Sequence, residues 1–130
     1  MIQARFIVEA QGKPKSFVEN TLKKHIETMK GVKDLEIYDE HWEPTEEMDG
    51  IFSALVDVGI KVPDFETFIA ALIGVAPSAV IVEEPEKLEI KLSELQTAVN
   101  DIVALYHAFA QKNAELTRAL ELLRARLKKS

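Results

Sequence analysis

The chain has 130 residues, of which 47% are hydrophobic and 29% charged, and it carries a net charge of −6. A length of about 100–150 residues is typical of a single globular domain. The absence of cysteine excludes disulfides, thiolate nucleophiles and metal sites built on cysteine ligands. The apolar runs are far shorter than the roughly 18 residues of a membrane helix, and the N-terminus does not resemble a signal peptide. We therefore expect a cytoplasmic protein. Asparagine and glutamine are scarce whereas glutamate and lysine are abundant, a composition that favours a heat-adapted source.

The charge is unevenly distributed along the chain. Residues 112–130 hold six basic and two acidic side chains, a net charge of +4, whereas residues 1–111 hold ten basic and twenty acidic side chains, a net charge of −10. Such a basic tail can offset the dipole at the end of a helix, contact the acidic part of another subunit, or meet an outside polyanion. The only basic stretch is the last seven residues, which disfavours nucleic acid as a partner.

A strand and a helix are predicted at the start of the chain. Residues 2–10 alternate between apolar and polar side chains, which is typical of a half-buried strand. Ser16 and Glu19 have the spacing of a capping box that opens a helix, and Gly31 is expected to end it. The buried stripe predicted for this helix comprises Val18, Leu22, Ile26 and Met29.

Further strands and a second helix follow. Residues 35–42 predict a second strand, but its apolar residues shift from one face to the other partway along, which indicates a bulge or an uncovered end. Residues 43–50 are expected to form an acidic turn. Residues 52–62 alternate without interruption and predict a strand with one buried face. Asp64 is the expected N-cap of a helix that ends at Gly74 and is apolar nearly all round. The alternation resumes in two more predicted strands, residues 79–82 and 88–92.

This element order resembles a ferredoxin-like βαββαβ sandwich, an α+β fold with helices on one face of an antiparallel sheet. The resemblance covers roughly residues 1–84 of a predicted domain of residues 1–92. The topology is shared by amino-acid-sensing regulatory domains, RNA-recognition modules, small metal carriers and oligomerisation domains, so it does not define a function. The metal carriers resemble each other through paired cysteines, which this chain lacks. The RNA-recognition modules carry aromatics in a basic, glycine-containing strand, and the corresponding residues 51–57 do not match it.

Residues 93–130 are predicted to form one long helix. Ser93 and Gln96 have the spacing of a capping box, and no glycine or proline follows them. A helix of about 35 residues is roughly 50 Å long, whereas a domain of ninety residues is only about 25–30 Å across. The helix is therefore expected to extend beyond its own domain.

The apolar residues of this helix recur in heptads over more than four repeats, the pattern of a coiled coil. Asn113 is the polar member of the series. If it is buried, its amide would fix the register and the number of helices. If it instead faces solvent, the helices are loosely packed at this position. The first half of the helix has additional apolar flanks, so it predicts a wide buried face, and the second half predicts a narrow seam. The ten positions of the predicted oligomer interface are Leu95, Val99, Ile102, Tyr106, Phe109, Asn113, Leu116, Leu120, Leu123 and Leu127.

Parallel pairing of this helix would form no salt bridge between its flanking positions, whereas antiparallel pairing would lay the basic tail along an acidic partner. The sequence therefore favours self-association into a dimer or tetramer with antiparallel or bundled helices, and closed two-fold symmetry is the commonest arrangement. A larger protein assembly is a further candidate partner.

Few residues carry a signal for chemistry. Asp39, His41 and Glu43 lie at alternate positions of the second strand and form a row that could hold a divalent ion, although such rows are usually solvated strand faces. Tyr38 and Trp42 stand among acidic residues, where they could contact another subunit or a partner protein; alternatively, Trp42 closes the edge of its own core. No catalytic, phosphate-binding or cofactor-binding motif occurs.

Two classes of function remain. The first is a non-enzymatic homo-oligomeric assembly or adaptor module, whose C-terminal helix mediates self-association. The second is a regulatory domain that binds a small molecule at the sheet or at a subunit interface, as amino-acid-sensing domains do. Such sensors usually accompany a catalytic or DNA-binding domain, and 130 residues leave room for neither, which favours the first class.

Overall fold

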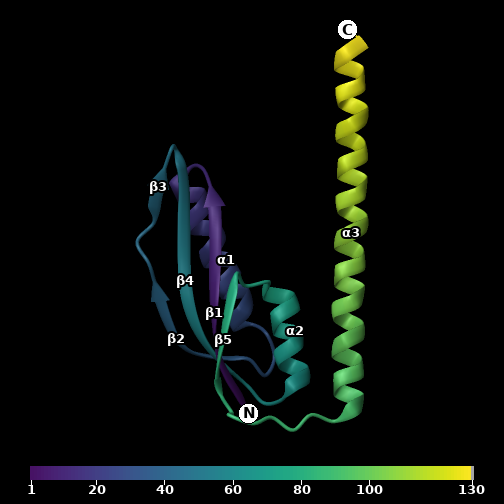
Figure 1. The fold of residues 1–130 in the computed structure, drawn as a ribbon. Helices are drawn as coiled ribbons and strands as arrows, with labels where there is room; N and C mark the ends of the chain where they lie inside the picture. The colour runs from purple at the N-terminus through teal and green to yellow at the C-terminus, as the bar shows by residue number, and fades with distance from the viewer. Residues whose placement is uncertain (130) are drawn as a thin grey trace. The chain divides into compact units, whose positions relative to one another are not determined.

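The computed structural model describes residues 1–129, which fall into two compact units, Met1–Glu94 and the residues from Leu95 onward (Figure 1). The first unit, here called the body, contains five strands and two helices: β1 (Ile2–Gly12), α1 (Lys15–Lys30), β2 (Glu36–Trp42), β3 (Glu46–Met48), β4 (Ile51–Val62), α2 (Phe65–Val75) and β5 (Ala79–Glu84). The second unit consists of α3 (Leu92–Lys129) from Leu95 onward. The predicted α+β class, an antiparallel sheet with helices followed by a long C-terminal helix, is confirmed.

The sheet of the body is antiparallel throughout, in the order β2-β4-β1-β5, and β3 pairs with the beginning of β4. Its centre is the long pairing of β1 with β4, which runs from Ile2 opposite Val62 to Gly12 opposite Phe52. β5 pairs with the other side of β1, and β2 pairs with the other side of β4. β2 and β5 therefore form the two edges of the sheet.

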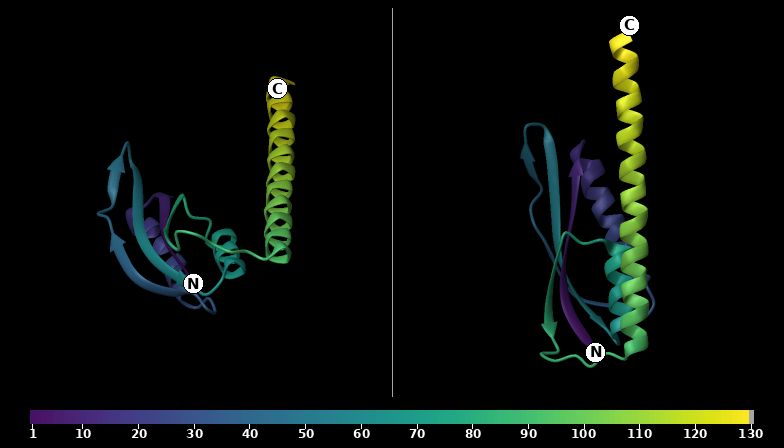
Figure 2. Two further views of the ribbon diagram at one scale, coloured as in Figure 1. Left: turned by 60° about the horizontal axis from the view of Figure 1, so that its bottom comes forward. Right: turned by 45° about the vertical axis from the view of Figure 1, so that its right-hand side comes forward.

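The core lies on one face of this sheet, beneath α1 and α2 (Figure 2). Every second residue of β1 and β4 points into it, as the alternation predicts, and the stripe predicted for α1 is buried as well. The opposite face is covered by neither helix, and we call it the open face. The buried members of the two central strands are Ile2, Ala4, Phe6, Val8, Ala54, Val56, Val58, Ile60 and Val62.

The change of parity in the second strand corresponds to a bulge. Ile37 lies opposite Ile60, but the next paired residue is Asp39 opposite Gly59, so Tyr38 is an extra residue in the strand. A single inserted residue turns the following side chains to the other face. Of the two explanations that the sequence left open, a bulge or an uncovered end, the structure shows a bulge, at Tyr38.

The ends of the first two helices differ from the prediction. α1 begins at Lys15, so Ser16 lies inside the first turn and does not form a capping box with Glu19. Instead, the carbonyl of Pro14 accepts hydrogen bonds from the N–H groups of Phe17 and Val18. Gly31 ends α1 as expected.

α2 has the predicted N-cap but a later end. The Asp64 side chain accepts a hydrogen bond from the Thr67 N–H at 2.8 Å. The helix continues past Gly74 to Val75, and Ala76 takes the left-handed conformation that terminates it. Pro77 follows directly, and proline after a cap is a common stop signal because it cannot continue the helix.

Two further predictions are wrong. Within the predicted acidic turn, Glu46–Met48 forms the short strand β3, whose residues lie opposite Ser53, Phe52 and Ile51. Residues 88–91, predicted as part of a strand, form no regular element, and Leu92 already begins α3. Three alternating apolar residues are too short a pattern to distinguish a strand from a connection. Because α3 starts at Leu92, Ser93 lies in its first turn and is not the N-cap.

α3 is one continuous helix of 38 residues, about 57 Å long at roughly 1.5 Å per residue. No helix within residues 1–129 has the length and the apolar character that a membrane crossing requires.

Candidate functional site

The ten predicted interface positions lie along one uninterrupted helix, α3, and all of them are exposed. We call this row of side chains the seam. Nine of its ten members are apolar or aromatic, and the exposed fractions of Leu116 and Leu123 are 60% and 53%. Large apolar side chains are normally buried, and a row of this length is uncommon on the surface of a monomer.

The charges of α3 separate into two halves. Residues 92–111 contain Glu94 and Asp101 and no lysine or arginine, whereas residues 112–129 contain six basic and two acidic side chains. The polar position of the seam, Asn113, lies where the halves meet, and its backbone carbonyl accepts a hydrogen bond from the Thr117 hydroxyl at 2.9 Å. One end of α3 is therefore acidic and the other basic.

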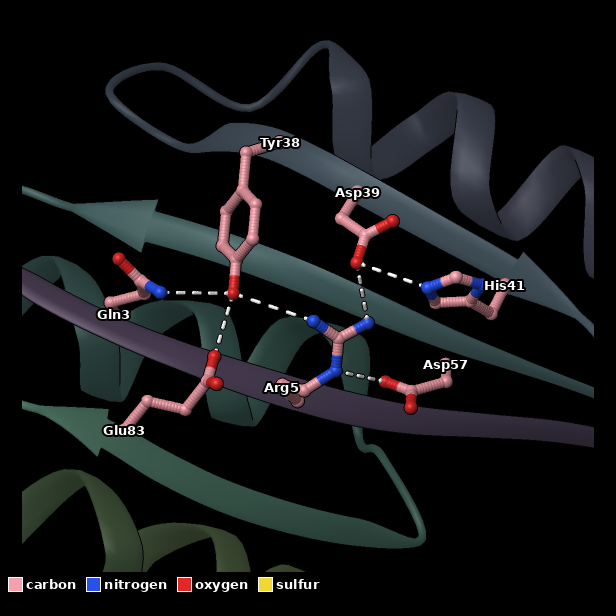
Figure 3. Close-up of polar contacts among 7 residues, drawn as sticks. All are labelled: Gln3, Arg5, Tyr38, Asp39, His41, Asp57 and Glu83. Atoms are coloured by element: carbon pink, nitrogen blue, oxygen red, sulfur yellow. Dashed lines mark hydrogen bonds and ion pairs between the residues drawn. The ribbon is translucent and has the colours of Figure 1, made fainter.

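A polar cluster spans four strands on the open face of the body (Figure 3). At its centre, Arg5 Nε of β1 donates to Asp57 Oδ1 of β4 at 2.8 Å. Arg5 Nη2 lies 3.1 Å from Asp39 Oδ2 of β2, an ion pair whose N–H is not aligned for a hydrogen bond. His41 Nε2 lies 3.2 Å from the same Asp39 oxygen.

Tyr38 joins this cluster to the edge strand β5. Its hydroxyl donates to Glu83 Oε1 at 2.6 Å and accepts from Gln3 Nε2 at 3.1 Å and from Arg5 Nη1 at 3.4 Å. The ring lies flat over Gly59: a Cβ atom at that glycine would be 2.6 Å from Tyr38 Cζ. The missing side chain of Gly59 is thus what allows the ring to cross β4 and reach β1 and β5.

The cluster shifts two pKa values. Desolvation lowers the pKa of Arg5, but the contacts with Asp57 and Asp39 outweigh this effect, so the pKa is raised and the guanidinium stays charged. The hydrogen bond to Glu83, together with desolvation, raises the pKa of Tyr38 against the opposing effects of Gln3 and Arg5. Both shifts favour the protonated groups that make the cross-strand contacts.

The row proposed as a metal site is divided by this arrangement. Asp39 and His41 are neighbours on the open face, but Asp39 is engaged by Arg5. Glu43 follows the end of β2 and lines a surface hollow together with Glu19 and Lys23 of α1. Within the described part of the chain, no three histidine, cysteine, aspartate or glutamate side chains are grouped so that they could hold a metal ion.

The two aromatic residues of the candidate partner patch lie on opposite faces of the sheet, and this corrects the idea of a single patch. Tyr38 lies on the open face, whereas Trp42 pairs with the buried Val56 and so points to the helical face. There Trp42 remains 43% exposed, and its indole N–H donates to Glu40, which also pairs with Lys30 of α1. The bulge at Tyr38 reverses the parity of β2 and separates the pair.

A pocket of about 460 Å³ lies between α1 and α2. Its floor is apolar, with Met29, Leu35 and Val75 among the lining residues. Ala71 and Gly74 are small, which leaves the pocket open between the two helices, and His25, Lys33 and Glu66 add polar groups to the lining.

In a comparison with known protein families, the model of the MJ0538 family matches residues 3–126. The chain belongs to the MJ0538 family. No curated protein and no solved structure matches it. The matched residues run from β1 into the last turns of α3, so the MJ0538 pattern includes the long helix as well as the body.

In this MJ0538-family chain, the sequence pattern alone did not reveal the polar cluster. Arg5 and Asp57 are charged residues in the middle of β1 and β4, on the face opposite the buried apolar side chains. Their positions on this face were the one sequence feature that could have indicated the cluster. Glu83 gave no such signal, because its contact with Tyr38 depends on the strand order.

Proposed function

We propose that this protein is a non-enzymatic homo-oligomeric assembly or adaptor module whose C-terminal helix α3 mediates self-association. The observation that carries the proposal is the exposed seam of nine apolar side chains on a single helix. Transfer of one exposed leucine from water into a protein interior contributes about 1.5–3 kcal/mol. A helix gains most of its stability from packing of its apolar face, so a second helix on the seam would stabilise α3 itself.

For the body, we infer the ferredoxin-like class. Its support is the order β2-β4-β1-β5 with α1 between β1 and β2 and with α2 between β4 and β5 along the chain. Both helices on one face agree with this class. The body would then be the element that the associated helices present to larger assemblies.

The charges of α3 favour antiparallel pairing of two copies. A parallel pair would place basic halves side by side, whereas an antiparallel pair places each basic half against an acidic half. The heptad spacing also allows it: Val99 would face Leu123 of the second copy and Ile102 would face Leu120, and all ten seam positions would be used. Antiparallel helices related by a two-fold axis form a closed dimer.

The proposal is tested by placing carboxylates in the seam. In the double variant Leu116→Asp, Leu123→Asp, charged groups would have to be buried without partners, so we expect the mass measured by light scattering to fall to that of a smaller species. Far-ultraviolet circular dichroism should also show lower helix content, because unpaired α3 loses the packing that stabilises it.

A matched control lies on the same helix. Leu122 is exposed to the same extent as Leu116, at 60%, but it lies one heptad position away from the seam, as does Ala108. The double variant Ala108→Asp, Leu122→Asp adds the same charge and should keep the wild-type mass. Equal masses for the two double variants would contradict self-association through the seam.

The pocket between α1 and α2 favours a second candidate function, a small-molecule-binding regulatory domain. A largely apolar pocket with a few polar groups is the usual form of a ligand site. A thermal-shift screen with metabolites and divalent ions distinguishes the two candidate functions. A ligand of this pocket would raise the unfolding temperature of the wild type and of the Leu116→Asp, Leu123→Asp variant alike, because the pocket does not include the seam.

A further inference from the structure

β5 forms one edge of the sheet of the body, and in the described part of that sheet no strand lies on its outer side. β5 is the last strand of the sheet, and within residues 1–129 the strand that pairs with it is β1. All six of its residues are exposed, including three consecutive branched apolar side chains: Val80 at 36%, Ile81 at 55% and Val82 at 55%. An exposed apolar edge is a template for pairing with another strand.

The opposite edge of the sheet is protected in ways that residues 79–82 of β5 lack. β2 is interrupted by the bulge at Tyr38 and carries charged residues on both faces, among them Asp39 and Glu40. Bulges and charges are common means of preventing strand addition. In β5, residues 79–82 contain no charge and no proline, and the irregularity in its pairing with β1 comes only after Val82.

The side chains of β5 suit pairing with a second β5. In an antiparallel pair centred on Ile81, Ile81 faces its own copy and Val80 faces Val82, so the apolar side chains meet each other. Glu83 and Glu84 then lie opposite Ala79 and Ser78 at the two ends of the pair, which keeps the carboxylates of the two copies apart. A parallel arrangement in register would place the glutamates side by side.

We propose that β5 pairs with β5 of a second copy of this chain in this antiparallel register, so that two bodies share one continuous sheet. Val80 and Val82 lie on the same face as the buried Phe6 and Ala4, so the pair would extend the apolar helical face across the junction. Ile81 and its copy would meet on the open face, opposite Arg5 in each sheet. The pairing uses the body alone and goes beyond the association of α3.

Cross-linking tests this pairing, because the chain has no cysteine of its own. Directly opposed residues in antiparallel strands have Cα atoms about 4.5–5.5 Å apart, within the range of about 4.4–6.8 Å that disulfides span. In the full-length chain, we expect Ile81→Cys to form a covalent dimer under mild oxidation at least tenfold faster than Met48→Cys. Met48 is a suitable control because it is exposed and lies on β3, outside the proposed pair.

The register has its own readout. A mixture of Val80→Cys and Val82→Cys chains should cross-link faster than either variant alone, because these residues face each other only in the pair centred on Ile81. Ile81→Cys dimers forming no faster than Met48→Cys dimers would overturn the edge pairing. A faster dimer from Val80→Cys alone would overturn the register.

The failure of this proposal can be told from that of the proposed function. An unchanged mass for Leu116→Asp, Leu123→Asp would contradict the α3 seam and leave the Ile81→Cys cross-link unaffected. Conversely, suppose that Ile81→Cys fails to cross-link while the Leu116→Asp, Leu123→Asp substitutions still lower the mass. That result would contradict the edge pairing and leave the α3 seam supported.

Discussion

Gly59 and Tyr38 show how one residue without a side chain organises the open face. The Tyr38 ring occupies the space above Gly59, and Lys61 Nζ lies 5.2 Å from the ring centroid. From there the hydroxyl contacts Gln3, Arg5 and Glu83, so one side chain of an edge strand connects to the two strands beyond β4. An aromatic ring packed over a strand glycine covers backbone that would otherwise be bare.

Gly59→Ala should therefore displace Tyr38. The added methyl group has no room beneath the ring, and overpacking of this kind costs about 1–3 kcal/mol. The displaced hydroxyl loses Glu83, the main cause of its raised pKa, so in an ultraviolet titration the pKa of Tyr38 should fall toward its ordinary value. An unchanged Tyr38 titration, with Tyr38→Phe used for assignment, would contradict the close packing.

At the scale of elements, the buried faces of helices and strands could be predicted from periodicity. The pairing of strands could not, because it depends on which segments lie next to each other. The buried faces of β1 and β4 and the stripe of α1 follow from repeated apolar spacing, and the length of α3 follows from the absence of glycine and proline after residue 92. The predicted Ser16 capping box is wrong because α1 begins at Lys15, with Pro14 as its N-cap. The predicted strand at residues 88–92 is wrong because three alternating apolar residues do not specify a pairing partner. The polar cluster depends on the order of strands, which no local pattern contains.

The N-cap of α2, Asp64, makes the free energy of unfolding depend on pH. Hydrogen bonds from Thr67 lower the pKa of Asp64 in the folded state. Since the folded pKa lies below the unfolded value of about 3.9, the stabilisation is complete above that value and is lost as pH falls through the folded pKa. Asp64→Asn keeps a capping oxygen but cannot titrate, and Asp64→Ala removes the cap.

We therefore expect Asp64→Ala to lower the unfolding temperature at neutral pH, and Asp64→Asn to lose less stability than the wild type between about pH 5 and about pH 2. The fluorescence of Trp42, the only tryptophan, reports unfolding of the body. Equal acid sensitivity in the wild type and Asp64→Asn would mean that other carboxylates control the acid transition.

At the scale of the whole molecule, self-association would use two separate surfaces with different chemistry. The α3 seam is a long apolar row with opposite charges at its ends, whereas the β5 edge is a short row of unpaired backbone with branched side chains. Pairing through the seam depends on side-chain burial, and pairing through the edge depends on main-chain hydrogen bonds. Substitutions in one surface should therefore leave the chemistry of the other intact.

The direction of the α3 pair is the last property that follows from its charges. In the antiparallel register, Val99 of one copy faces Leu123 of the other, whereas a parallel pair in register brings each residue against itself. A short bis-maleimide should therefore join Val99→Cys to Leu123→Cys chains in a mixture and leave each variant alone mostly uncoupled. Higher salt should slow this coupling, because at about 1 M the Debye length falls to roughly 3 Å and the attraction between the acidic and basic halves is screened. Rapid coupling of Val99→Cys to itself would establish the parallel pair, with Asn113 facing its own copy, and would contradict the charge argument.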